Sequence, residues 1–279
     1  MKNQSHLKGK VVVLTGGASG IGAETATWLT REDAAVVLAD INEMGLERKR
    51  AELTPLGARV LSVVTDVTQS RSWRNLFDRA IQEFGHIDVL VNCAGVIHPG
   101  PVETLSEERV RMQVEVNLIG TVYGTQVFLP YFRQRNEGHI IHTASLGGIV
   151  PLPNEAVYSA TKFAVRGLCL ALALELHDTP IHVSVICPDS VETEQVRQEA
   201  TEGGCALSFT SQLLQPSDVA RAIVKTILRP KREVFVPQLR GLLSKVGDFS
   251  PNLVGVLYPF LKGMGERGRA KYLKTLSID

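Results

Sequence analysis

The chain has 279 residues, 44% of them hydrophobic, and its 30 Lys and Arg nearly balance 29 Asp and Glu. This hydrophobic content predicts a large buried core and excludes a wholly disordered chain. The near-zero net charge provides no overall field for nucleic acid, so no DNA or RNA partner is expected. No apolar run approaches the roughly 20 residues of a membrane-spanning helix, and polar residues 1–10 lack the apolar region of a secretory signal. We expect a soluble, cytoplasmic, globular protein.

Short runs rich in Val, Ile and Leu alternate along the chain with longer segments of helical period. The runs predicted to be strands are 11–15, 35–40, 59–64, 87–92, 139–143, 182–187 and 233–236. The predicted helices lie near 20–31, 42–53, 70–84, 106–134, 156–178 and 217–228. Almost continuously apolar strands are typical of a parallel sheet covered on both faces. The alternation predicts right-handed crossovers and one doubly wound α/β domain over residues 1–237.

Residues 238–279 differ from the rest of the chain in composition. They hold seven basic and three acidic side chains, a net charge of +4, so residues 1–237 carry −3. They are also rich in Leu, Val and Phe, as is typical of a helix that lies on a membrane surface. Because the charge excess is small, a C-terminal helical extension packed on the core or on a partner subunit is favoured.

The cysteines and two of the histidines are the residues of the sequence that could form a metal site. The four cysteines have no C-x-x-C spacing and lie at Cys93, Cys169, Cys187 and Cys205. This distribution predicts buried free thiols rather than a disulfide framework or a zinc site. His139 and His142 lie three residues apart in a predicted strand, where alternation points them to opposite faces. No metal site is therefore expected.

A glycine-rich turn, Thr15–Gly22, follows the first predicted strand and precedes the first predicted helix. Such a turn places free backbone N–H groups and the positive end of a helix against a dinucleotide pyrophosphate. Asp40, at the end of the second predicted strand, can accept hydrogen bonds from the adenosine ribose, and it would repel a 2′-phosphate. The first basic residue after it is Arg48. The pattern predicts NAD rather than NADP, with a helix cap as the alternative role for Asp40.

Tyr158 and Lys162 are four residues apart in a predicted helix, so both side chains project from one face. The nearby cation is expected to lower the Tyr158 pKa toward the neutral range that acid–base catalysis needs. Ser145 follows the fifth predicted strand, at the sheet edge where open α/β sheets bind ligands. Its surroundings lack the G-x-S-x-G pattern of a hydrolase nucleophile. Asn117 could anchor a buried water chain through its amide, although by itself it fits an exposed or capping position.

Together with Asp66-Val67 and Asn92-Cys93-Ala94-Gly95, these motifs occur in the order and at the spacings of one enzyme family. Over almost all of residues 1–237 the chain resembles the classical short-chain dehydrogenases/reductases. The resemblance implies a single Rossmann-type domain with a seven-stranded parallel sheet in the order 3-2-1-4-5-6-7. It also implies a homodimer or homotetramer assembled through the helices near 106–134 and 156–178.

The resemblance further implies roles for individual residues. Tyr158 would donate or accept the proton, and Lys162 would bind the nicotinamide ribose and lower the Tyr158 pKa. Ser145 would hold the substrate oxygen, and Asn117 would hold a proton-relay water. The expected cofactor-binding residues are Gly16, Ser19, Gly20, Ile21, Gly22, Asp40, Ile41, Asp66, Val67, Asn92, Ala94, Gly95, Tyr158, Lys162, Pro188, Val191 and Thr193.

Two positions depart from the family pattern. Cys93 replaces the second Asn of the usual Asn-Asn-Ala-Gly, a change that we expect to be tolerated. Asp189 replaces the usual glycine after Pro188, which restricts the backbone and puts a carboxylate near the nicotinamide or the substrate entrance. The geometry of the predicted substrate lid, residues 189–214, is therefore left open.

These features predict an NAD(H)-dependent oxidoreductase that interconverts a secondary alcohol and a ketone by hydride transfer. The segment 193–214 has no basic cluster to clamp a phosphate, and an apolar tail suits a hydrophobic, steroid- or lipid-like substrate. The tail would also permit peripheral membrane contact. One alternative is an NADPH-dependent ketoreductase of biosynthesis, which Asp40 argues against. The other alternative is a non-enzymatic dinucleotide-sensing protein. The presence of all four expected catalytic residues, Asn117, Ser145, Tyr158 and Lys162, argues against it.

Overall fold

A parallel β-sheet forms the centre of the molecule, of which the computed structural model describes residues 7–276. Within these residues the sheet has seven strands in the order β3-β2-β1-β4-β5-β6-β7, as predicted. The strands are β1 Val11–Thr15, β2 Ala35–Asp40, β3 Val60–Val64, β4 Val89–Asn92, β5 Gly138–Thr143, β6 Ile181–Pro188 and β7 Glu233–Val236. Residues 1–6 and 277–279 lie outside the described part. The first range belongs to the N-terminus that we expect to be polar, and the second ends the predicted extension.

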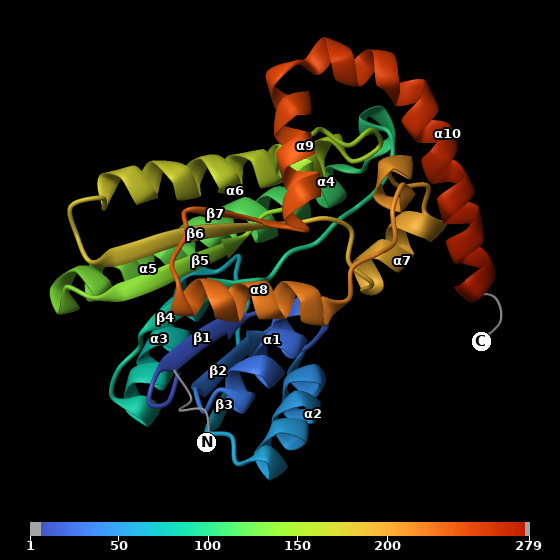
Figure 1. Ribbon diagram of the computed structural model, residues 1–279. Coiled ribbons are helices and arrows are strands. Elements are labelled where there is room, and N and C mark those ends of the chain that lie inside the picture. The colour runs from blue at the N-terminus through green and yellow to red at the C-terminus, as the bar shows by residue number, and fades with distance from the viewer. Residues whose placement is uncertain (1–6, 277–279) are drawn as a thin grey trace, which may run out of the picture.

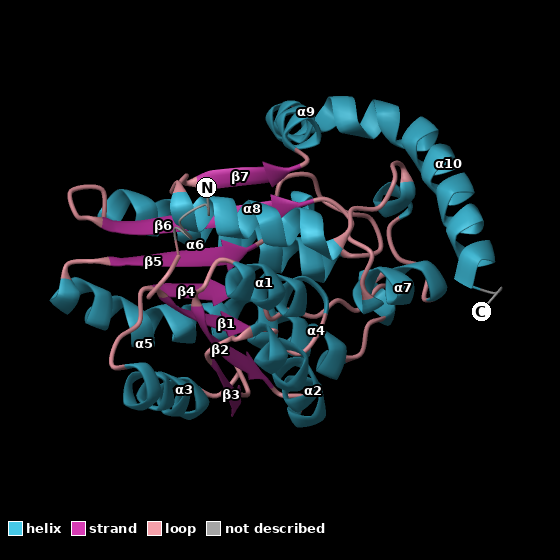
Figure 2. Ribbon diagram, turned by 60° about the horizontal axis from the view of Figure 1, so that its bottom comes forward, coloured by secondary structure: helices cyan, strands magenta, loops and turns pink. Residues whose placement is uncertain are grey.

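Helices cover both faces of the sheet (Figures 1 and 2). They are α1 Gly20–Arg31, α2 Glu43–Leu53, α3 Ser70–Phe84, α4 Glu107–Val114, α5 Gly120–Arg135, α6 Ala156–Glu175, α7 Glu194–Thr201, α8 Pro216–Leu228, α9 Gln238–Phe249 and α10 Pro251–Leu276. Side chains of α3, α5 and α6 build the core on one face, and those of α1, α2 and α8 build the core on the other.

Alternate residues of the central strand supply these two cores. In β1, Val11 and Val13 belong to the core on the α3 side, whereas Val12 and Leu14 belong to the core on the α1 side. All four are fully buried, and each such side chain contributes roughly 1.5–3 kcal/mol on burial. Burial on both faces explains why the strands are continuous apolar runs in the sequence.

The helix α6 is long and apolar enough to cross a membrane by length and composition. The sequence-based expectation that no segment is long and apolar enough to span a membrane is therefore wrong for this helix. In the fold, Val165, Cys169 and Leu172 of this helix are buried in the core beside the sheet. The same helix carries Tyr158 and Lys162. Its apolar character thus matches a helix that packs against a sheet.

The predicted helix 106–134 is interrupted by a π-helical turn, Glu115–Ile119, between α4 and α5. The extra residue in a π turn rotates the following helix and is a frequent feature of functional sites. Here the turn contains Asn117, which is 1% exposed. Gly120 directly follows this turn, but a single glycine within a helical pattern does not reveal a π turn, and the sequence predicts one continuous helix here.

The C-terminal helices α9 and α10 extend beyond the sheet; α9 packs against β7, and α10 passes beside α7 (Figure 1). The helix α10 rests on a 3₁₀ turn, Ala206–Phe209, through two glycines. A Cβ atom at Gly265 would lie 1.9 Å from the Ala206 carbonyl oxygen, and one at Gly268 would lie 2.0 Å from that of Phe209. These glycines permit close packing, and the predicted helical extension is confirmed.

Candidate active site

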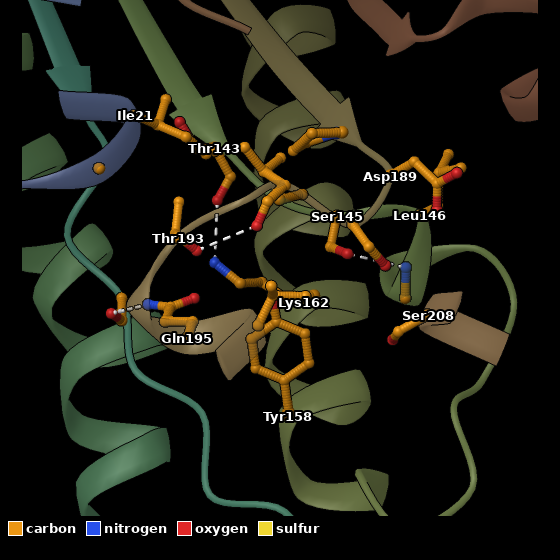
Figure 3. Close-up of a pocket in the computed structure, with 18 of the residues that line it drawn as sticks. Ile21, Thr143, Ser145, Leu146, Tyr158, Lys162, Asp189, Thr193, Gln195 and Ser208 are labelled. Atoms are coloured by element: carbon orange, nitrogen blue, oxygen red, sulfur yellow. Dashed lines mark hydrogen bonds between the residues drawn. The ribbon is translucent and has the colours of Figure 1, made fainter. Parts of the chain in front are cut away.

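A cavity of about 1380 Å³ opens at the carboxyl ends of the strands. It is lined by the turn after β1, the loops that follow β2, β3, β4, β5 and β6, and the first turns of α6. The segment 189–214 and the helices α9 and α10 complete its walls. We call this cavity the cleft; Figure 3 shows part of its lining.

The glycine-rich turn has the geometry of a phosphate-binding turn. Gly16 has a φ of 69°, a left-handed conformation, and a Cβ atom there would lie 3.0 Å from the Ala94 nitrogen. A Cβ atom on Gly22 would lie 2.1 Å from the Gly16 carbonyl oxygen, so helix α1 can start this close to β1 only with glycine. Ser19 precedes α1 without a side-chain cap, which leaves the first N–H groups of the helix free for an anion.

Asp40 is held against this turn. Its Oδ2 accepts a hydrogen bond from the Ala18 amide at 3.1 Å, and its Oδ1 accepts one from the Asn42 amide at 3.0 Å. The cap of α2 is Asn42, which accepts from the Gly45 amide, so Asp40 is not the helix cap. Lys49 of α2, overlooked in the sequence, also lines the cleft and pairs with Glu52 at 3.1 Å.

Ser145, Tyr158 and Lys162 meet in the cleft (Figure 3). Lys162 Nζ donates a hydrogen bond to the Thr143 carbonyl at 3.0 Å and lies 5.5 Å from the centre of the Tyr158 ring. Burial lowers the pKa of Lys162 to about 8. Ser145 Oγ accepts from the Gly147 amide at 3.0 Å, and the same hydroxyl is hydrogen-bonded to Tyr158.

The ionisation of Tyr158 differs from the sequence-based expectation. Its pKa is raised, first by burial and then by the nearby Glu199 carboxyl, while the hydrogen bond to Ser145 opposes the rise. A phenolate loses its hydration on burial. This loss raises the pKa of Tyr158 by more than the attraction of the Lys162 ammonium, 5.5 Å from the ring centre, lowers it. The protonated phenol is therefore the stable form in this structure.

Two of the predicted site residues lie behind the cleft wall. Asn117 Oδ1 accepts from the Val96 amide at 2.8 Å, and Nδ2 donates to the Val96 carbonyl at 2.9 Å and to Thr161 Oγ1 at 3.1 Å. Both amide hydrogens are thus used within the protein, and only Oδ1 could accept from a water. Asn92 is buried, with Nδ2 3.0 Å from His142 Nδ1. The other predicted site residues all line the cleft.

Several cleft residues were not found from the sequence. Gln195 Nε2 donates to the Gly95 carbonyl at 2.5 Å and joins α7 to the loop after β4. Arg240 of α9 was also not found; it forms an ion pair at 2.7 Å with Asp189, whose carboxylate the sequence did place near the cleft entrance. Glu155 and Glu199 also line the cleft. Gln195 and Glu155 have partners that lie 100 and 50 positions away in the sequence, so no local pattern identifies them.

The part of the cleft beyond Ser145 and Tyr158 has mostly apolar walls. They include the side chains Leu146, Val150, Leu152, Leu207, Leu239, Leu243, Val246, Leu257, Leu261 and Met264. The last six belong to α9 and α10. The C-terminal extension therefore forms one wall of the cleft.

The chain is similar to curated proteins and to solved structures. It is 39% identical over 189 residues to the 2,5-dichloro-2,5-cyclohexadiene-1,4-diol dehydrogenase LinX of Sphingobium indicum. This alignment covers 68% of this chain and 76% of that protein. It is 32% identical over 255 residues to 17-beta-hydroxysteroid dehydrogenase 13 of Mus musculus, with 89% and 82% of the two chains covered.

Two crystal structures have the same architecture. One is a short chain dehydrogenase/reductase of Burkholderia phymatum in complex with NAD, with a TM-score of 0.82, 28% identity, and 88% and 95% of the two chains covered. The other is a 3-ketoacyl-(acyl-carrier-protein) reductase of Brucella melitensis complexed with NADH, with a TM-score of 0.75, 30% identity, and 82% and 97% covered.

A family model described as short chain dehydrogenase matches residues 10–203, which include the phosphate-binding turn, Ser145, Tyr158 and Lys162. By this match, and by the sheet order and the cleft that accompany it, the chain belongs to the short chain dehydrogenase family of oxidoreductases.

Proposed function

We propose that the protein is an NAD(H)-dependent oxidoreductase that interconverts a secondary alcohol and a ketone of hydrophobic, steroid- or lipid-like character. The observation that carries this proposal is the meeting of Ser145, Tyr158 and Lys162 in one cleft with the phosphate-binding turn and Asp40. In this proposal Tyr158 would stand between the bound dinucleotide and an apolar substrate, as transfer between the two requires.

The residues present fit a nicotinamide adenine dinucleotide. The N–H groups at the start of α1 would hold its phosphates, and the Asp40 carboxylate would hold the adenosine ribose. Asp66 and Val67 line the cleft where they could contact adenine, and Pro188, Val191 and Thr193 line it near the proposed nicotinamide end. Bound NAD supplies the hydride acceptor for alcohol oxidation.

The chain's own residues handle the substrate proton. Ser145 Oγ positions the substrate oxygen, and Tyr158 Oη accepts the hydroxyl proton in oxidation or donates it in reduction. Because the pKa of Tyr158 is raised by burial, the phenol is ready to donate at neutral pH, and oxidation is expected to gain rate at alkaline pH. The Lys162 ammonium would bind the nicotinamide ribose from its position on the Thr143 carbonyl.

The preference for hydrophobic substrates is supported by the apolar wall of α9 and α10. The names of the hydroxysteroid and cyclic diol dehydrogenases among the relatives are compatible with this substrate class. A specific observation keeps an NADPH-dependent ketoreductase as the second candidate: Lys49 lines the cleft, where a cation could partly offset the repulsion between Asp40 and a 2′-phosphate.

We assign residues 1–237 to the catalytic domain, 189–214 to its substrate lid, and 238–279 to the extension. A homodimer or homotetramer through α4–α5 and α6 remains our proposal for the assembly. We also propose a cytoplasmic protein whose extension can touch a membrane. The exposed apolar side chains of α9 and α10 support this contact; they are Leu239, Leu242, Leu243, Val246, Phe249, Val256, Leu257 and Phe260.

The variant Y158F tests the proposed chemistry. It should bind NADH as the wild type does, measured by fluorescence titration, and lose turnover of secondary alcohols with NAD by about 10²–10⁴-fold, the usual contribution of a general acid–base group. Y258F, which removes a tyrosine hydroxyl from α10, serves as the matched control. Comparable turnover by Y158F and Y258F would reject the assignment, and inactivity of the wild type on every alcohol and ketone tested would favour a dinucleotide-sensing role.

A further inference from the structure

Two glutamates meet beside the catalytic tyrosine: Glu155 is buried, and Glu199 is partly buried with its Oε2 atom inaccessible to solvent. Glu155 immediately precedes α6, and Glu199 belongs to α7. A Cβ atom on Gly204 would lie 2.6 Å from Glu155 Oε1 and 2.9 Å from the Glu199 Cβ atom, so both side chains converge on the same glycine. The contact joins the start of the catalytic helix to the 189–214 segment.

Each of these carboxyl groups has one satisfied oxygen and one unsatisfied oxygen. Glu155 Oε1 accepts from the Cys205 amide at 2.6 Å, and the Glu199 carboxylate is hydrogen-bonded to the Ser208 hydroxyl. The Oε2 atoms of Glu155 and Glu199 are both buried without a hydrogen-bond partner among the described residues. An unsatisfied buried acceptor costs roughly 1–3 kcal/mol, and a charged one costs more. A proton on one carboxyl turns an acceptor into a donor and can remove both penalties.

The surroundings of the pair favour retention of such a proton. The ionisable groups that face it are Tyr158 of α6, Cys205, and Asp189 at the end of β6 with its partner Arg240. Arg269, a basic residue of α10, donates to the Gly204 carbonyl at 3.3 Å and is not hydrogen-bonded to either glutamate. Burial raises the pKa of both glutamates; the proximity of Glu199 raises that of Glu155 further, and Asp189 acts in the same direction on Glu199.

We propose that Glu155 and Glu199 share one proton and latch the 189–214 segment onto the start of α6. The protonated carboxyl donates its O–H to an oxygen of the other, and the pair then carries a single negative charge. The burial of both Oε2 atoms fits an internal bond better than a bond to substrate in the cleft, because neither atom exposes surface to a ligand. Loss of the proton to solvent leaves two carboxylates at close range, and their repulsion loosens the segment that covers the cleft.

The sign of the effect follows from linkage. The closed form binds the shared proton more tightly than the open form, in which water reaches both carboxylates and their pKa values return toward the ordinary range. Closure is therefore favoured at low pH and is lost as the pH rises through the raised pKa of the pair. Each pKa unit of difference between the two forms changes the open-to-closed ratio about tenfold.

Hydrogen–deuterium exchange on the full chain tests the latch without recourse to turnover. Amides of residues 194–209 are compared between wild type and E199Q at the same pH, in a series from about pH 6 to about pH 9, which brackets the raised carboxyl range. Glutamine keeps a donor but cannot ionise. We expect the ratio of the wild-type exchange rate to the E199Q exchange rate to increase about tenfold from the acid to the alkaline end of the series. A ratio that stays constant over the series overturns the proposal.

E194Q is the matched control, because Glu194 lies on the same helix with its side chain 87% exposed. It should follow the wild type at every pH. The shared proton is also detectable directly in the wild type, as the infrared band of a protonated carboxyl at neutral pH that vanishes on the alkaline side and is diminished in E155Q. If E199Q does not fold, this band decides the question: absence of a protonated carboxyl at neutral pH overturns the latch.

Discussion

Asp189 and Arg240 form a 2.7 Å ion pair between the end of β6 and helix α9. The Asp189 side chain is only 10% exposed, and Ser211 Oγ also donates to it at 3.3 Å. Arg240 in turn donates to Thr210 Oγ1. The family resemblance leads one to expect glycine at position 189. In this chain the aspartate anchors the C-terminal extension to the wall of the cleft.

Removal of Arg240 should release this anchor. In R240M the Asp189 carboxylate stays largely buried without its cation, so the free energy of unfolding should fall by more than it does in D189N/R240M. We expect a coupling of about 2 kcal/mol, between the values of exposed and buried pairs. Urea unfolding of the wild type, D189N, R240M and D189N/R240M gives the coupling free energy. Additive effects would show that the two side chains act independently.

The glycine contacts of α10 give a second test with a control on the same helix. A Cβ atom at Gly265 would lie 1.9 Å from the Ala206 carbonyl oxygen, whereas nothing lies within 4 Å of one at Gly263. G265A should separate α10 from the 206–209 turn and speed hydrogen exchange in α10. G263A should leave the packing intact and raise the unfolding free energy by up to about 1 kcal/mol, since alanine is the better helix former. Equal exchange in the two variants would contradict this packing.

Cofactor selection should depend on Asp40. D40A removes the repulsion of a 2′-phosphate but retains Lys49, so the ratio of kcat/KM for NADP to that for NAD should rise by about 10-fold or more, or roughly 1.4 kcal/mol. D40A/K49A should lose part of this gain, because the remaining cation is gone. Steady-state kinetics with both cofactors measures the ratios. A ratio unchanged from wild type would remove Asp40 from cofactor selection.

Two buried histidines should make the fold sensitive to acid. His139 Nε2 is 2.8 Å from Ser184 Oγ, and burial lowers the pKa of His139 to about 3 and that of His142 to about 4. The unfolded chain binds these protons near pH 6.5, so stability is lost as the pH falls below that value. For His142 the loss approaches about 3 kcal/mol near pH 4.

Urea unfolding over a pH series checks this prediction. H142Q cannot take up the proton, so its unfolding free energy should fall less steeply between about pH 6.5 and about pH 4 than that of wild type. H177Q, which alters a histidine with 61% exposure, should keep the wild-type slope. Parallel curves for H142Q and wild type would mean that His142 is not the group that titrates.

Local patterns in the sequence were sufficient for the sheet and for the phosphate-binding turn of the cleft. The inner strands β1, β2 and β4 are apolar runs buried on both faces, and the phosphate-binding turn lies within a few residues of β1. Tyr158 and Lys162 share one helix face at a spacing of four residues. Such features depend on neighbours along the chain, so they are readable before folding.

Only the tertiary structure decided how the site is charged and enclosed. The pKa of Tyr158 is raised because burial removes water from the phenol, and no spacing along the sequence reveals burial. Glu155 and Glu199 meet across 44 positions of sequence, and Asp189 meets Arg240 across 51. The sequence by itself determined an α/β fold with a dinucleotide turn, and it left open whether the apolar tail packs on the core, on a partner subunit or on a membrane. Packing then placed that tail as a wall of the cleft, because contacts between distant segments exist only once the chain is folded.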